Sequence, residues 1–245
     1  MKIVMVVRRT PSGTIRSFQH TLLELVNMGR GKAAVILLGP PGSGKTTIAD
    51  DVTSRWDVAV IKTGQLLRRE INKKTTLGKR LKPFLDAGKL APSAWVAEVI
   101  EEEIRHIHNH WIWFDGFPRR EDEIEPFFRI CKKGNMYMAA AVVLQISRSL
   151  AAKRLTGRRV CPNCHAVYNI YFDPPERDGI CDHCGTQLEQ RKDDTMELVN
   201  HRWQVYEEET KPVIAYLTEH HPQGTHLIPA EESAEKKLNS ILSIM

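Results

Sequence analysis

Short apolar runs recur along the chain and alternate with segments that follow a helical pattern. Aliphatic, β-branched and aromatic residues make up each run, which is typical of parallel strands buried on both faces. Five such runs lie at 33–38, 58–61, 111–114, 139–146 and 226–228. This alternation predicts a three-layer α/β/α protein in which helices cover both faces of a parallel five-stranded sheet. Ligands of such a fold bind at the carboxyl ends of the strands.

Helical patterns occupy the segments between the apolar runs. After Pro92, apolar residues recur at helical spacing through Ile107. Further helices are expected at 46–55, 65–71, 79–86, 120–131, 150–155, 193–220 and 230–244. Proline lacks the N–H that a helix interior needs. Pro126 is therefore expected to break its helix near the first turn, and Pro212 to kink or break the long helix.

A glycine-rich segment directly follows the first apolar run. It fits the pattern G-x-x-x-x-G-K-[ST], with Gly39, Gly44, Lys45 and Thr46 at the fixed places. The backbone N–H groups of such a loop turn toward one point, and the start of the following helix adds partial positive charge. The lysine then reaches the outer phosphates, and a threonine hydroxyl can meet Mg²⁺. The segment therefore predicts a bound nucleoside triphosphate.

Four of the five cysteines form two C-x-x-C pairs with the overall spacing C-x₂-C-x₁₆-C-x₂-C. This spacing is typical of a tetrahedral structural zinc site, in which each pair offers two thiolates on one tight turn. The surrounding segment has little helical pattern, which argues against a redox pair that opens a helix. The expected zinc ligands are Cys161, Cys164, Cys181 and Cys184. Cys131 is expected to be a free thiol.

Basic residues stand at the end of a predicted strand and on both sides of the cysteine-rich segment. Arg119 follows the third apolar run, Arg154 and Arg158 precede the cysteines, and Arg191 and Arg202 follow them. Phosphoryl transfer needs charge neutralisation and alignment more than acid–base chemistry. Guanidinium groups that converge on a Mg²⁺–phosphate centre meet that need, since each can bind two oxygens at once.

With these motifs in place, the chain from Ala33 to its C-terminus resembles the adenylate kinases that carry a zinc-containing lid. The matching segments are the phosphate loop, T-G-x-x-L-R at 63–68, D-A-G-K-L at 86–90, D-G-F-P-R at 115–119 and the cysteine pairs. The resemblance implies reversible phosphoryl transfer from ATP to AMP that gives two ADP, with Mg²⁺ and a structural Zn²⁺ as cofactors. It also implies a kinase domain over 32–245, with a monophosphate-binding insert at about 62–91 and a lid at about 157–190.

The resemblance also implies the site residues. ATP is expected to bind Gly42, Ser43, Gly44, Lys45, Thr46, Thr47, Arg154, Arg158, Val167 and Tyr168. The monophosphate is expected to bind Thr63, Arg68, Lys89, Leu90, Ala91, Gly116, Phe117, Pro118, Arg119, Glu123, Arg191 and Arg202. The residues expected to act in catalysis are Lys45, Asp115 (near the waters of Mg²⁺), Arg119, Arg154, Arg158, Arg191 and Arg202.

Three positions depart from the usual pattern of that family. The phosphate loop ends in two threonines, Thr46 and Thr47, in place of G-T, so either is a candidate for the metal. Gln65 stands where an aspartate is common. Glu123 stands where a glutamine usually reads adenine by accepting one hydrogen bond and donating another. An ionised glutamate only accepts. Either a neighbouring group or water completes the contact with AMP, or the local register is shifted by one residue, or the acceptor is another base, such as guanine with its two adjacent donors.

Two other functions stay open beside this one. The first is a kinase for another nucleoside monophosphate, namely GMP, CMP or UMP. The second is a zinc-ribbon protein that binds nucleic acid and hydrolyses ATP as a switch, with Tyr168, Tyr171 and Phe172 as stacking surfaces. Acidic residues at 173, 176, 178 and 182 would repel phosphates there. The acceptor motifs would also lack a role, so no nucleic-acid partner is expected.

Bulk properties set further limits. A net charge of +5 suits a protein that binds phosphorylated small molecules. No apolar run approaches the length that a bilayer requires, and the cysteines are too few for a secreted disulfide scaffold. The lack of a long apolar run argues against a membrane partner. We also expect the protein to be a cytoplasmic monomer.

Residues 1–31 are basic and poor in acids, which is compatible with a transit peptide or with an extension upstream of a start at Met28. An accessory or poorly ordered extension is favoured.

Overall fold

The structure is a computed structural model that describes residues 31–244. The extension expected at the N-terminus therefore lies outside the described residues, apart from Gly31. Within 31–244, no helix combines the length and the apolar composition that crossing a membrane would need.

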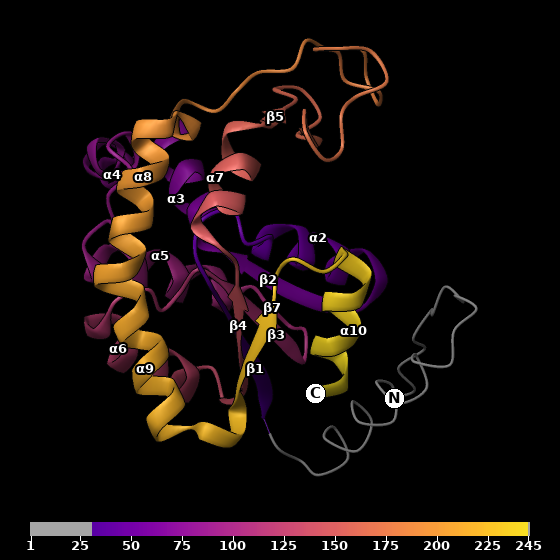
Figure 1. The fold of residues 1–245 in the computed structure, drawn as a ribbon. Helices are drawn as coiled ribbons and strands as arrows, with labels where there is room; N and C mark the ends of the chain where they lie inside the picture. The colour runs from indigo at the N-terminus through magenta and orange to yellow at the C-terminus, as the bar shows by residue number, and fades with distance from the viewer. Residues whose placement is uncertain (1–30, 245) are drawn as a thin grey trace, which may run out of the picture.

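A five-stranded parallel sheet forms the centre of the molecule (Figure 1). Its strands are β1 (Lys32–Leu38), β2 (Val58–Lys62), β3 (Trp111–Asp115), β4 (Met136–Gln145) and β7 (Thr225–Pro229), in the order β2-β3-β1-β4-β7. All four pairings are parallel. The five strands that the apolar runs predict are thus confirmed. β4 begins earlier than expected, and its register against β1 shifts between Ala34 and Val35.

Helices cover both faces of this sheet, which confirms the three-layer architecture. Alternate residues of β1 point to opposite faces, since side chains in a strand have a period of two. One face packs against α3 (Thr63–Asn72), α4 (Thr76–Asp86), α5 (Ser93–Arg105), α6 (Ile124–Lys133) and α9 (Lys211–His220). The other packs against α2 (Lys45–Arg55) and α10 (Ala234–Ile244).

Several helix boundaries differ from the sequence-based prediction, each for a local reason. α4 starts at Thr76 because the hydroxyl of Thr75 accepts the N–H of Gly78 at 2.9 Å and caps the helix. The last helix starts at Ala234, later than expected, because Ala230 still donates its N–H to Gln145 of β4 at 2.6 Å.

The two prolines also act differently from expectation. Pro126 lies in the first turn of α6, where its missing N–H would have no helical partner in any case, so it starts the helix without a break. The long helix over 193–220 consists of α8 (Met196–Val205), a π-helical segment (Tyr206–Thr210) and α9. Pro212 stands in the first turn of α9, and the wider turn lies directly before it.

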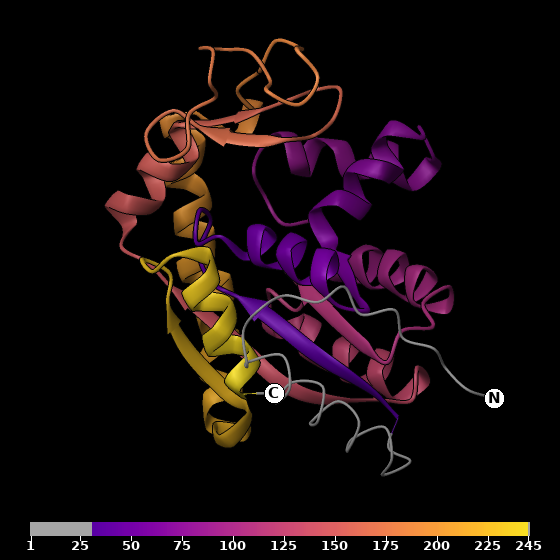
Figure 2. The ribbon, with the colours of Figure 1, turned by 90° about the vertical axis from the view of Figure 1, so that its right-hand side faces the viewer.

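The cysteine-rich segment forms a separate small layer. Here β5 (Arg158–Val160) and β6 (Val167–Asn169) pair antiparallel. Figures 1 and 2 both show this segment, in orange, extending beyond the end of α7 (Arg148–Thr156) and away from the sheet.

Candidate active site at the phosphate loop

The phosphate loop joins β1 to α2 at the carboxyl edge of the sheet. Gly44 is the N-cap residue of α2 and has a φ of 91°, a conformation that glycine adopts without strain. Gly42 also has a positive φ, and a Cβ there would lie 2.8 Å from the carbonyl oxygen of Ala151. Ser43 is fully buried. The loop is therefore held by its neighbours in the shape that turns backbone N–H groups toward a phosphate.

Lys45 folds back over this loop. Its Nζ donates to the carbonyl oxygens of Gly39 at 2.7 Å and Pro40 at 2.9 Å. Burial lowers the pKa of Lys45 to about 7, against the attraction of Asp115, and nearby Arg119 lowers it further. An ammonium group in such surroundings gains from a bound anion, since a phosphate would supply the missing negative charge.

Thr46 and Asp115 meet beside the loop. Because β1 and β3 are parallel neighbours, with Leu37 opposite Asp115, the end of β3 lies next to the phosphate loop. The hydroxyl of Thr46 donates to Oδ2 of Asp115 at 2.8 Å. Hydroxyl and carboxylate oxygens suit Mg²⁺, directly or through its waters, so the donor set here fits that ion. Thr46 and Thr47 are both exposed, and it is Thr46 that bonds to Asp115.

Three arginines and two aspartates form an arginine–aspartate network above the sheet edge. Arg158 binds Asp194 in a bidentate pair, with N–O distances of 2.7 and 2.6 Å. Arg202 reaches Asp194 at 3.3 Å and Asp193 at 3.2 Å, and Arg191 binds Asp193 at 2.8 Å. Burial alone would raise the pKa of Asp193, but Arg202 and Arg191 hold it below its ordinary value. These two aspartates orient three of the arginines that the sequence singles out.

Positive charge exceeds negative charge around this network. Partial burial lowers the pKa of Arg68 to about 10, and repulsion from Arg191, Arg158 and Arg119 contributes to the shift. Arg202 also acts on Lys45 in the same sense. The phosphate loop, the start of α3 and the network thus share one strongly positive region, as a site for two phosphorylated ligands requires.

Asp193 and Asp194 belong to this network, and the sequence-based site assignment does not include them. The sequence does place both aspartates close to Arg191, in the segment Arg-Lys-Asp-Asp. Their importance depends on the arginines that they bind, which come from β5 and α8. A local motif does not reveal such partners.

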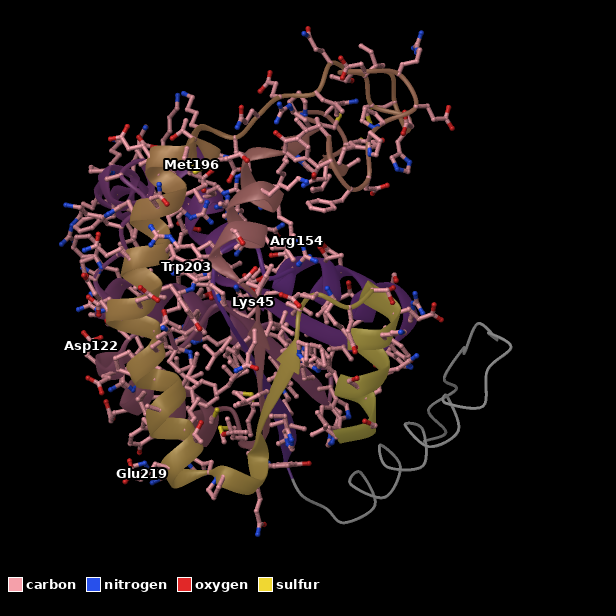
Figure 3. The ribbon with its side chains drawn as sticks, viewed as in Figure 1. Lys45, Asp122, Arg154, Met196, Trp203 and Glu219 are labelled. Atoms are coloured by element: carbon pink, nitrogen blue, oxygen red, sulfur yellow. The ribbon has the colours of Figure 1, made fainter. Side chains whose placement is uncertain are left out.

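Arg154 connects the phosphate loop to the last part of the chain. Its guanidinium donates to the carbonyl oxygens of Ala230 at 3.1 Å and Gly42 at 3.5 Å. Figure 3 shows Lys45 and Arg154 close together at the centre of the molecule, below the cysteine-rich segment. The structure thus brings these two expected ATP-binding residues to one place.

Apart from Glu123 and the network residues Arg191 and Arg202, the residues expected to bind the monophosphate fall on three segments. Thr63 begins α3, while Lys89, Leu90 and Ala91 follow α4. Lys89 is exposed, whereas Ala91 is buried in the core. The third segment, 116–119, follows β3. There the guanidinium of Arg119 folds over Gly116, where a Cβ would lie 2.1 Å from Nη2 and would therefore displace it.

Glu123 is buried and binds the backbone of the segment 116–119. Its side chain is only 3% exposed, and its Oε2 accepts the backbone N–H of Arg119 at 2.7 Å. Burial raises the pKa of this carboxyl group to about 7, against the effect of that hydrogen bond and of the Arg119 charge, and with a contribution from Asp122. One carboxyl oxygen of Glu123 is therefore engaged with the backbone.

Stability should depend on pH through Glu123. The pKa near 7 in the fold exceeds the value of about 4.3 in an unfolded chain, so ionisation of Glu123 destabilises the fold as pH rises between these values. Glu123→Gln keeps an acceptor for Arg119 and removes the charge. We expect its melting temperature to exceed that of the wild type by a few degrees at pH 8 and to equal it at pH 4.5. Glu121→Gln, at an exposed position, is the control; an equal gain for Glu123→Gln at both pH values would contradict the account.

The four expected zinc ligands come together. Sγ–Sγ distances are 3.4 Å for Cys161–Cys184 and 3.5 Å for Cys164–Cys181, and all four sulfurs lie within 4.8 Å of one another. Tetrahedral zinc with bonds of about 2.3 Å separates its sulfurs by about 3.8 Å, so this donor set fits Zn²⁺. Cys131 lies outside the cluster, buried on α6, and is free as expected.

Tyr168 is one of the two lid positions expected near ATP. Its ring is buried in the cysteine cluster, where its hydroxyl lies 3.5 Å from Sγ of Cys181 and accepts the N–H of Asp182 at 2.9 Å. The hydroxyl therefore supports the expected zinc ligands. Val167, the other lid position expected near ATP, is 58% exposed.

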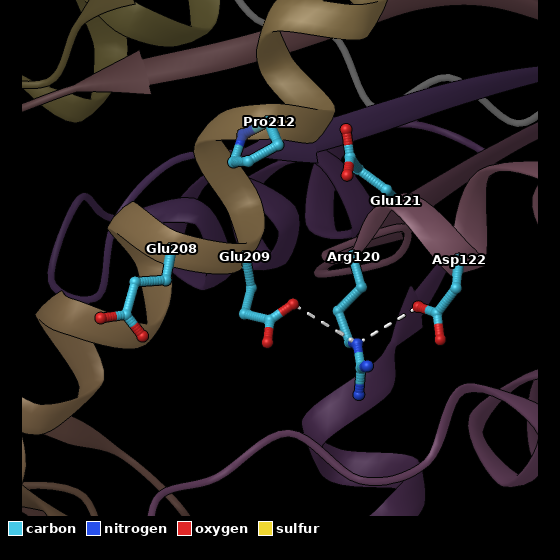
Figure 4. Close-up of a pocket in the computed structure, with 6 residues that line it drawn as sticks. All are labelled: Arg120, Glu121, Asp122, Glu208, Glu209 and Pro212. Carbon is cyan, nitrogen blue, oxygen red and sulfur yellow. Dashed lines mark ion pairs between the residues drawn. The ribbon is translucent and has the colours of Figure 1, made fainter.

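A shallow pocket of about 240 Å³ lies away from the phosphate loop, between the turn after β3 and the π-helical segment (Figure 4). In it, Arg120 pairs with Asp122 at 3.2 Å and with Glu209 at 3.5 Å. Glu121 and Glu208 also line it, so acids outnumber the single arginine and would repel a phosphate. This pocket is therefore poorly suited to a nucleotide, unlike the strongly positive region at the phosphate loop.

Comparison with known proteins agrees with this geometry. The model of the adenylate kinase family matches residues 37–221. Adenylate kinase of Thermoanaerobacter sp. (strain X514) is 39% identical over 185 residues, which cover 75% of this chain and 85% of the relative. Adenylate kinase of Clostridium novyi (strain NT) is 37% identical over 185 residues, or 75% of this chain and 86% of the relative. The chain has a phosphate loop on a five-stranded parallel sheet, arginines surround this loop, and the chain is similar to these relatives over most of its length. The chain therefore belongs to the adenylate kinase family.

Proposed function

We propose that the phosphate loop, Asp115 and the arginine–aspartate network carry out the reaction of the adenylate kinase family in this chain. In that reaction an oxygen of the AMP phosphate bonds to the γ-phosphorus of ATP, and the bond from that phosphorus to the β–γ bridging oxygen breaks. Two ADP result, and the reaction is reversible. The observation that supports this most is the convergence of Lys45, Arg68, Arg119 and the network arginines on one edge of the sheet.

The roles divide between donor and acceptor. We assign Lys45, Arg154 and Arg158 to ATP, and Arg68, Arg119, Arg191 and Arg202 to the monophosphate. Thr46 and Asp115 would hold Mg²⁺, which neutralises charge on the phosphates when bound. The chain's own residues align the two nucleotides and stabilise charge on the transferring group.

As the resemblance implies, we assign the monophosphate-binding insert to about 62–91 and the lid to about 157–190. Closure of the insert and the lid over the bound nucleotides would exclude water, so that the phosphoryl group is transferred to AMP and not to water. We also propose that the protein is a cytoplasmic monomer whose ligands are nucleotides and metal ions.

Acceptor preference depends on Glu123. With a pKa near 7, a neutral Glu123 offers one donor and one acceptor, as a glutamine does, while the ionised form only accepts. If this residue faces the base, Glu123→Gln should raise kcat/KM for AMP about tenfold at pH 8 and little at pH 6, since one hydrogen bond is involved. The assay would compare AMP, GMP, CMP and UMP at both pH values. A preference for GMP that Glu123→Gln weakens would favour guanine as the base, and unchanged selectivity would show that Glu123 does not contact the base.

A further inference from the structure

Lys237, on α10, is a buried lysine that the proposed mechanism leaves without a role. Its side chain is 6% exposed, although lysine is rarely buried unless it is paired. Its Nζ donates to the carbonyl oxygen of Ala230 at 3.3 Å. Among residues 31–244 it makes no ion pair. Burial, followed by the nearby charge of Arg154, lowers its pKa, and Glu232 opposes the shift.

The ammonium group of Lys237 lies directly beside the phosphate loop. A Cβ placed on Gly44 would be 3.5 Å from this Nζ, and no other heavy atom outside the glycine's own neighbourhood would lie within 4 Å. Gly44 caps α2 and immediately precedes Lys45. Lys237, close to the end of the chain in sequence, therefore places a positive charge at the start of α2, next to the phosphate loop.

A second cation shares the position. Arg154 donates to the same oxygen of Ala230 at 3.1 Å, and its other nitrogen reaches Gly42 in the phosphate loop. Arg154 likewise makes no ion pair in the described part of the chain. Glu231 and Glu232, whose charges oppose the lowering of the pKa of Arg154 and Lys237, are exposed. Two partly desolvated like charges beside one carbonyl are unfavourable without an anion. The phosphate chain of a nucleotide is such an anion.

We propose that Lys237 is a binding residue for the donor nucleotide and contacts the phosphate chain of ATP on the Gly44 side of the phosphate loop. It would act together with Arg154, while Lys45 binds the same chain from within the loop. This inference rests on the proposed function, which places ATP at that loop. The chemistry that recognises the ligand is a polyphosphate, because a lysine ammonium is a compact charge with three donors and no acceptor.

Binding measurements on the zinc-loaded protein test this inference. Lys237→Met removes the charge and the donor, Lys237→Gln keeps a donor for Ala230 but removes the charge, and Lys236→Met changes an exposed lysine on the same helix. Calorimetric titration would use ATP, inorganic tripolyphosphate and AMP. We expect both Lys237 variants to bind ATP and tripolyphosphate about tenfold more weakly, as loss of one charge-assisted hydrogen bond implies. AMP affinity and the melting temperature without ligand should not fall, and Lys236→Met should bind as the wild type does.

Unchanged affinity for ATP and tripolyphosphate in the Lys237 variants would overturn the inference. So would recovery of normal binding in Lys237→Gln, because Lys237 would then only hold Ala230, and so would an equal loss for AMP. A Lys45→Met variant assayed in parallel separates the two proposals. If it retains turnover, the proposed function fails; if it loses turnover while the Lys237 variants bind normally, only this inference fails.

Discussion

Lys45→Met is expected to lower turnover by a factor on the order of a thousand while the fold stays intact, because one charged donor to the transferring phosphate is lost. Methionine has a similar length and keeps the packing of the stem. Burial lowers the pKa of Lys45 to about 7, so the charged form of this lysine destabilises the fold near neutral pH. The variant should therefore be at least as stable as the wild type at pH 7. A coupled assay of ADP formation and a thermal melt would measure both effects.

Lys236→Met is the matched control for this variant, since Lys236 is exposed and far along the chain from the loop. It should leave turnover and stability unchanged. Near-normal turnover in Lys45→Met would rule out the assigned role of Lys45, whereas a large loss of stability would mean that the lysine is needed for the fold itself.

Loss of zinc is expected to have the second largest effect. The cysteine-rich segment has a core of few residues, with Tyr168 and Leu188 packed around the buried Cys161 and Cys181. Such a small core does not stabilise a segment on its own, so the free energy of metal binding becomes folding free energy of this segment. Cys161→Ser should therefore lose the bound zinc and lower the melting temperature by several degrees. It should also lower turnover at least tenfold, because β5 positions Arg158.

Metal analysis of freshly purified, reduced protein checks this account directly, and about one Zn²⁺ per chain is expected. Cys131→Ala is the control, because Cys131 lies on α6 outside the cluster. It should keep its zinc even if it loses some stability in the core. Wild-type protein without zinc would contradict a structural metal in the cysteine-rich segment. So would a Cys161→Ser variant with the melting temperature and turnover of the wild type.

Local patterns were sufficient to predict the strands, the phosphate loop and the cysteine cluster. Each depends on residues close together in sequence: apolar runs for the sheet, fixed glycine spacing for the loop, and two C-x-x-C turns for the metal ligands. The features that escaped prediction depend on residues brought together by the fold. Asp193 and Asp194 matter because of arginines on other elements, and Tyr168 is buried because a second cysteine pair packs against its ring.

Two further differences have the same origin. The π-helical segment before Pro212 belongs to a long helical region that the periodicity of apolar residues describes well, so nothing local marks the wider turn. Lys237 fits the polar pattern of a surface helix in sequence, and only the packing of α10 beside the phosphate loop shows that it is buried.

The most direct test of the central claim is the stoichiometry of the reaction. Purified protein would be incubated with ATP, AMP and Mg²⁺, and all phosphorus-containing species would be followed by ³¹P NMR. The account predicts that two ADP form for each ATP consumed, only when AMP is present, without release of inorganic phosphate, and that ADP alone gives ATP and AMP. Release of inorganic phosphate from ATP at a rate independent of AMP would contradict it and would identify an ATPase instead of a kinase.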